Sequence, residues 1–281
     1  WQTVSAGRVE ISFAVYPAAA SAAYTLPRPL LQYANGRTEA EIGQRWVALL
    51  EDAIAAAQAD AQGPRFADFN SFLVFHAGVG QETGQMHDIL SVFLSPADLR
   101  RWAGRPVLAD GGQFELPSAW ILPETPAFTG QAGLNGLLAR FFGHQLGLPG
   151  LSNYAAGLPA VGGWSLMDVG SNRYSVLRRA RPGLSDSLLT GVGFVPPHPF
   201  AWSQAQLGWL EPLVVQRDTT VALLALDRQG QLPRAVRIPV DRDQYLLLEN
   251  RQCRGRVGVP QGVASPYADG ERIVWIDDGQ V

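Results

Sequence analysis

The stretch from Arg140 to Leu151 (RFFGHQLGLPGL) is where the chemistry of this chain is expected. His144 carries an imidazole that can bind a transition metal or transfer a proton near neutral pH. Arg140 lies four positions earlier, so the two side chains would share one face of a helix. A single histidine is a weak metal ligand, because a catalytic zinc ion needs three protein ligands. Taken alone, this stretch therefore falls short of a catalytic zinc site.

The other histidines are scattered along the chain. His76 ends an apolar run (SFLVFH), His87 lies in a polar loop, and His198 lies between prolines. Their spacing is not that of metal ligands, so a structural role is the simpler interpretation for each. A new zinc site that combines them with His144 and nearby carboxylates is kept as an alternative.

Other catalytic patterns are incomplete. Glu82 and Asp88 could form an acid/base pair, but two carboxylates in a solvated loop are the simpler interpretation. The sequence around Ser165 (GWSLM) lacks the final glycine of a nucleophile elbow. The glycine-rich loop at 77–84 has one residue too many for a dinucleotide-binding fingerprint. None of these patterns identifies a reaction.

Helix and strand patterns place these residues on an α/β framework. A capping box at Thr38 and apolar residues at helical spacing predict a helix over 38–59. Strands are expected at Val9–Tyr16 and Ser71–His76, and this strand–helix–strand order favours parallel pairing. Further helices are expected at 95–102, at about 130–146 and around Trp202, and an edge strand at 115–122.

The last third of the chain changes character. Strand-like runs occupy 219–226, 235–240, 244–249 and 272–276, whereas the segment after Gly157 is rich in glycine and serine and is expected to be loop. We therefore expect a first domain at 1–212 and a β-rich portion at 213–281, possibly part of the same domain.

Five further motifs are SFLVFHAGVGQETG, LGLPGLSN, GGWSLMDVGS, PPHPFAWSQAQLGWLEP and YLLLENRQ. Together they resemble the immune inhibitor A family of metzincin-type zinc peptidases. The resemblance covers roughly residues 9–277, in order and at plausible spacing. It implies a metzincin-like α/β (α+β) fold, with Met167 in the methionine turn beneath the metal.

The family's zinc motif is His-Glu-x-x-His-x-x-Gly-x-x-His/Asp. Aligned on Gly147, it places Arg140 at the first histidine, Phe141 at the glutamate, His144 at the second histidine and Gly150 at the third ligand. Arginine has no lone pair for a metal and stays charged, phenylalanine cannot accept a proton, and glycine has no side chain. Only His144 remains of the motif's functional residues.

The resemblance also suggests a role for Arg140. Its fixed positive charge would lie where the family holds its metal, with Asp168 or Glu82 as the charge partner. This charge-replacement hypothesis requires a carboxylate within reach of the guanidinium.

Composition limits the other functions. The chain has 281 residues, 47% hydrophobic and 17% charged, which suits a globular fold. It contains no lysine, which excludes Schiff-base and P-loop lysine chemistry. A net charge of -3 and scattered arginines argue against a nucleic-acid partner. No apolar run is long enough to span a membrane.

These observations lead to one expectation and two alternatives. We expect a non-catalytic pseudopeptidase domain, extracellular or on the cell surface, that needs no cofactor and binds another protein or joins a surface assembly. The first alternative is an active zinc peptidase with a non-standard metal site. The second is a structural subunit of a larger surface assembly.

Overall fold

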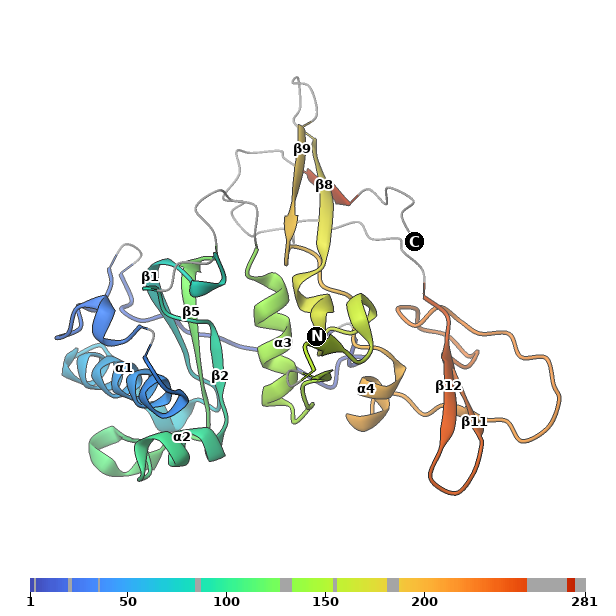
Figure 1. Cartoon of the computed structure of the whole chain (residues 1–281), viewed down its shortest axis with the longest axis horizontal. Coiled ribbons are helices and arrows are strands. Elements are labelled where there is room, and N and C mark those ends of the chain that lie inside the picture. Colours follow the sequence, from blue (N-terminus) through green and yellow to red (C-terminus); the bar gives the residue numbers. More distant parts are fainter. Residues whose placement is uncertain are drawn as a thin grey trace. The chain divides into compact units, whose positions relative to one another are not determined.

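The protein mixes helices with small sheets and belongs to the general α+β class (Figure 1). Its contacts divide the chain into a smaller unit, Ile11–Gly130, and a larger unit, Trp1–Glu10 with Gln131–Val281. The computed structural model describes residues 1–2, 4–19, 22–34, 36–83, 87–126, 133–153, 156–180, 187–251 and 272–275.

In the smaller unit, a long helix packs on a three-stranded sheet. Helix α1 (Glu39–Ala59) begins where Thr38 accepts a hydrogen bond from the Glu41 N–H, as the capping box predicts. The sheet has the order β1 (Leu73–Val79), β5 (Ala119–Thr125), β2 (Val92–Leu94). Strands β1 and β5 are parallel, and β2 is antiparallel to β5.

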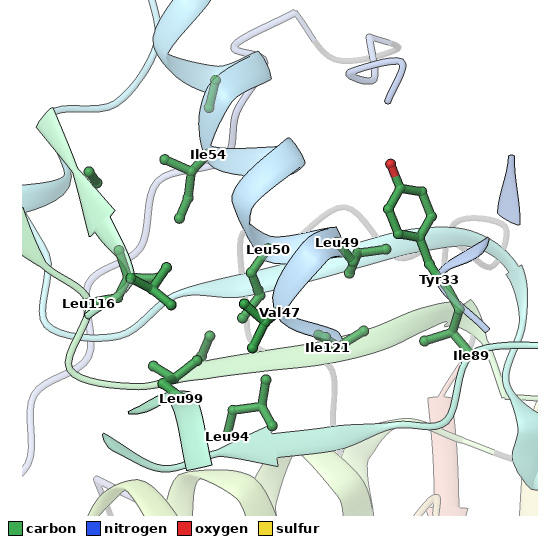
Figure 2. Close-up of a cluster of buried hydrophobic side chains, with 14 of the residues drawn as sticks. Tyr33, Val47, Leu49, Leu50, Ile54, Ile89, Leu94, Leu99, Leu116 and Ile121 are labelled. Carbon is green, nitrogen blue, oxygen red and sulfur yellow. The ribbon is translucent and has the colours of Figure 1, made fainter. Parts of the chain in front are cut away.

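The core of this unit lies between α1 and the sheet. Figure 2 shows Val47, Leu50 and Ile54 of α1 above Ile121 of β5, with Leu94 nearby. Fully burying each such side chain contributes about 1.5–3 kcal/mol. The apolar residues that recur at helical spacing over 38–59 therefore form the face of α1 that is buried in this core.

Short elements complete the smaller unit. Helix α2 (Pro96–Ala103) starts with a capping box between Ser95 and Asp98. The other elements are β3 (Leu108–Ala109), β4 (Phe114–Glu115) and the 3-10 turns Leu30–Gln32, Phe66–Asp68, Gln81–Thr83 and Asp110–Gly112.

The larger unit contains two short helices and several small sheets. Its helices are α3 (Asn135–Gln145) and α4 (Ala201–Gln206), and its 3-10 turns are Gly162–Trp164 and Val169–Asn172. Its strands are β6 (Ser152–Asn153), β7 (Leu158–Pro159), β8 (Tyr174–Ala180), β9 (Ser187–Val192), β10 (Leu213–Val214), β11 (Ala235–Pro239), β12 (Tyr245–Glu249) and β13 (Arg272–Trp275). The sheets have the orders β13-β8-β9, β10-β11-β12 and β6-β7.

The strand expected at Val9–Tyr16 is wrong. These residues lie outside any strand, and Phe13 is 85% exposed. A strand needs a partner edge for its N–H and C=O groups, and alternating apolar residues do not provide one. The parallel partner of β1 is β5, which the strand–helix–strand reasoning did not identify.

Three other strand expectations need correction. The strand expected at 115–122 is not at an edge, because β5 is the central strand and Pro117 precedes it. Residues 219–226 form only an isolated bridge, between Ala225 and Asn250. The segment after Gly157, expected to be loop, contains the hairpin of β8 and β9.

The boundary expected near residue 212 does not coincide with the division between the two units. A small core joins both sides of it, since Ala201 and Leu210 pack with Leu226 and Ala235. Residues 213–251 are therefore held to α4 by buried apolar contacts, and the units divide instead at residue 130.

Candidate functional site

The candidate site is built on the end of helix α3. The helix ends at Gln145, and Gly147 follows with a positive φ of 93° that favours glycine. The Leu148 N–H donates to the Gly143 carbonyl across this turn, at 2.9 Å. The turn brings the chain back so that Gly150 faces the last helical turn. Of the helix expected at about 130–146, residues 130–132 lie outside the described residues, and the helix begins at Asn135, after Gly133 and Leu134, which are not part of it.

Positions 140, 144 and 150 converge in space. A Cβ atom placed on Gly150 would lie 3.7 Å from Cε1 of His144 and 3.8 Å from Nη2 of Arg140. Both separations are ordinary van der Waals contacts, so a side chain at position 150 would face the other two without a clash. The first, second and third ligand positions of the aligned motif therefore meet at one point in the larger unit.

His144 is oriented by the turn that follows it. Its Nδ1 lies 3.0 Å from the Leu148 carbonyl oxygen, which can only accept, so Nδ1 donates the hydrogen bond. In the neutral ring, Nε2 then carries the lone pair. A histidine whose other ring nitrogen donates to a carbonyl is typical of metal sites, where this bond fixes the tautomer.

Electrostatics in the site favour the neutral form of His144. Burial lowers the pKa of His144, the hydrogen bond to Leu148 opposes this effect, and the positive charge of Arg140 lowers the pKa further. The site thus pairs a permanently charged guanidinium with an uncharged imidazole near neutral pH.

Replacing Arg140 with Gln raises the pKa of His144 toward its ordinary value, because one of the two influences that lower it is removed. An NMR titration of the imidazole C–H signals measures the change. Arg217→Gln is the matched control, since it removes the same charge from an exposed position of the same unit. An unchanged pKa in Arg140→Gln would show that the guanidinium does not act on His144.

Met167 lies directly against the back of α3. It is fully buried, and a Cβ on Gly143 would lie only 2.5 Å from its sulfur. A Cβ on Gly136 would lie 1.7 Å from the Ser171 carbonyl oxygen. Gly136 and Gly143 are seven positions apart on one helix face, so both allow the segment that carries Met167 to approach closely. This glycine spacing is a signal that the sequence contains, although the motifs do not include it.

Asp168, proposed as a charge partner of Arg140, is a buried acceptor for its own loop. It accepts hydrogen bonds from Ser152 Oγ at 2.6 Å and from the Val161 and Gly162 N–H groups at 2.8 Å each. Burial alone would raise its pKa, but these bonds and one from Val169 lower the pKa to about 2. Asp168 therefore fixes the loop before the Met167 segment, and its pairing with Arg140 stays a hypothesis.

Glu82, the other proposed partner, lies in the smaller unit and bonds within its own loop. Its Oε1 accepts a hydrogen bond from the Ser91 N–H at 2.8 Å. Nothing in these contacts involves Arg140, and this pairing also stays a hypothesis.

The other histidines form no group of three potential metal ligands in the described part of the chain. His76 is 8% exposed, and its Nδ1 lies 3.0 Å from the Ala77 carbonyl oxygen. His87 and His198 are exposed. Among the described residues, no three His, Cys, Asp or Glu side chains gather closely enough to hold a metal ion. Cys253 lies outside the described residues.

A pocket of about 390 Å³ lies on the larger unit and was not anticipated from the sequence. Two of its residues come from the chain just after α3, two from the start of α4, and two from β12. They are Leu151, Val161, Phe200, Trp202, Leu247 and Glu249. No local pattern could identify this pocket, because its walls come from segments about 50 residues apart.

Comparisons of this chain with known proteins give no match. No family model, no curated protein and no solved structure matches it. The family resemblance thus rests on the quoted motifs alone. Among the described residues, no helix is long and apolar enough to cross a membrane.

Proposed function

We propose that this chain is a non-catalytic, metzincin-like domain of the immune inhibitor A kind, retained for binding another protein or for joining an assembly. The observation that carries the proposal is the convergence of positions 140, 144 and 150, occupied by a guanidinium, an imidazole and a bare glycine. This is the geometry of a three-ligand site with one ligand remaining.

These residues do not fit a zinc ion. The guanidinium of Arg140 has no lone pair and carries a permanent positive charge beside His144, which repels a cation. Gly150 contributes no donor atom. Phe141, at the motif position of the general base, is 6% exposed and has no group that accepts a proton from water. We therefore derive no hydrolytic step at this site.

The binding role is supported by what the larger unit retains. The close packing of Gly136 and Gly143 against the Met167 segment, and the hydrogen bonds of Asp168, keep the loops around the vestigial site in fixed positions. A fold that keeps such a scaffold without its metal ligands is suited to recognition. The proposed extracellular or cell-surface location and the protein partner rest on the family resemblance.

A peptidase assay tests the proposal. The purified chain is incubated with unfolded protein substrates, with added zinc and with a chelator, and we expect no cleavage in either condition. His144→Ala is the matched variant, because it removes the one remaining motif ligand. Zinc-dependent cleavage that His144→Ala abolishes would contradict the proposal and favour an active peptidase with a non-standard metal site.

A further inference from the structure

We infer that the pocket beside α4 binds a neutral aromatic side chain of a peptide. This inference rests on the proposed binding role but not on the loss of the metal site. A volume of about 390 Å³ is within the range of small-ligand sites and is ample for one ring with its adjoining amide. Its lining is aliphatic and aromatic except for Glu249.

Two rings give the pocket a flat wall. The Phe200 and Trp202 rings are stacked, with centroids 5.9 Å apart and planes 27° apart. Both side chains are half-buried, so each keeps part of its surface available. A ligand ring can pack against this wall in the offset or edge-to-face arrangements that aromatic pairs prefer. The aliphatic side chains of Leu151, Val161 and Leu247 complete the lining of this open pocket.

The charge of Glu249 is already compensated. Its Oε1 lies 2.5 Å from Nε of Arg251, and its Oε2 accepts a hydrogen bond from the Ala201 N–H at 2.5 Å. Arg251 also donates to the carbonyl oxygens of Trp164 and His198, at 2.6 and 3.3 Å. The ion pair is therefore locked between two loops and α4.

The ion pair between Glu249 and Arg251 favours a neutral ligand over a cationic one. Rings beside a carboxylate are typical of sites for cations, but here Arg251 supplies the cation and would repel a second one. A carboxylate with two bonds still has lone pairs for a further donor. Glu249 can thus accept one amide N–H from a peptide whose neutral ring lies in the pocket.

Two aliphatic residues of the pocket, Leu151 and Val161, are held by hydrogen bonds to the segment that contains Met167 and Asp168. The Val161 N–H donates to Asp168, and the Leu151 N–H donates to the Met167 carbonyl at 2.9 Å. Leu151 directly follows Gly150, so its Cα is about 3.8 Å from that of the third motif position. The pocket and the vestigial site therefore share one framework in the larger unit.

NMR titrations with two model compounds test the inference. N-acetyl-phenylalaninamide has a neutral aromatic side chain between two amides. N-acetyl-argininamide has the same backbone and a side chain of similar length that carries a positive charge. We expect the first to shift the indole N–H signal of Trp202, which is assigned by its loss in Trp202→Phe, and to bind about tenfold more tightly than the second. All titrations are made with chelator present, so no metal contributes.

Val161→Phe places a ring in the pocket and should weaken binding of N-acetyl-phenylalaninamide by about tenfold. Leu246→Phe is the matched control, because Leu246 neighbours Leu247 on β12 but is 56% exposed and does not line the pocket. Thermal unfolding shows whether each variant folds. If Val161→Phe does not fold, Trp202→Ala serves instead, with binding measured by saturation transfer to the ligand.

Three outcomes would overturn the inference: no shift of the Trp202 signal up to the solubility of the ligand, equal binding of the arginine compound, or full binding by the folded pocket variants. The proposed function fails separately, through zinc-dependent cleavage in the peptidase assay. The two tests are independent. Cleavage would contradict the proposed function but not the pocket inference, and a lack of ligand binding would contradict the pocket inference but not the loss of catalysis.

Discussion

We expect the variant that combines Arg140→His and Gly150→His to bind one zinc ion per chain, and we expect no such binding by the natural chain. The two substitutions supply two further imidazoles beside His144. The side chains of His144 and Arg140 both reach the Cβ position of residue 150, with Cε1 of His144 at 3.7 Å and Nη2 of Arg140 at 3.8 Å. Three protein ligands and a water complete a tetrahedral site. The Leu148 carbonyl holds the His144 ring in place. Isothermal titration calorimetry with zinc measures the affinity and the number of ions bound per chain.

The zinc affinity of the double variant should exceed that of the natural chain by more than about 10–100-fold. That range is the loss of affinity when a metal site loses a residue that only hydrogen-bonds to a ligand, and here whole ligands are added. Phe141 is left unchanged, since it is 6% exposed and a carboxylate there would be buried. Adding His144→Ala to the same double variant is the control and should abolish tight binding. Tight binding that survives this change would mean that the three positions do not form the site.

Replacing Asp168 with Asn lowers the free energy of unfolding by about 3 kcal/mol. The carboxylate accepts bonds from Ser152 and from the Val161 and Gly162 N–H groups, and it is fully buried. An amide cannot accept at both of its ends, so buried donors lose their partner. Denaturant unfolding measures the change. Asp241→Asn is the control, because Asp241 accepts similar backbone bonds in an exposed turn.

The same carboxylate gives stability a defined pH dependence. Its pKa is about 2 in the folded protein and near 3.9 in an unfolded chain. The folded pKa is the lower one, so the contribution is complete above the unfolded pKa and is lost as the pH falls from about 5 toward 2. It amounts to roughly 2–3 kcal/mol. An Asp168→Asn variant whose stability falls just as steeply over this range would assign the acid sensitivity to other groups.

Local sequence signals predicted the helices well. The capping box at Thr38 and the apolar period placed α1 within one residue of Glu39–Ala59, and Ser95 with Asp98 placed α2. The glycine and proline after residue 146 likewise located the end of α3. These signals depend only on neighbouring residues, so they need no knowledge of the rest of the fold.

Strands were harder to predict because they depend on distant partners. The alternating residues at 9–16 have the pattern of a strand but no partner edge, while β2 has a partner in β5 but is only three residues long. The β8–β9 hairpin lies in a segment whose glycines and serines suggested a loop. Pairing overrides composition in each case.

In the candidate site, too, the features set by local sequence could be predicted and those set by tertiary contacts could not. The spacing of Arg140 and His144 was enough to predict that the two residues share a helix face, and Gly150 joins them through the turn at Gly147. The bonding of Asp168 to Ser152 and the aromatic pocket depend on tertiary contacts, so no local sequence pattern indicates them.

Elemental mass spectrometry of the purified natural chain, before and after dialysis against zinc, tests most directly the proposal that this chain lacks a working metal site. We expect no retained zinc in either sample, because the guanidinium of Arg140 repels the ion and Gly150 offers no ligand. One zinc ion per chain after dialysis, lost on substitution of His144 with Ala, would contradict it.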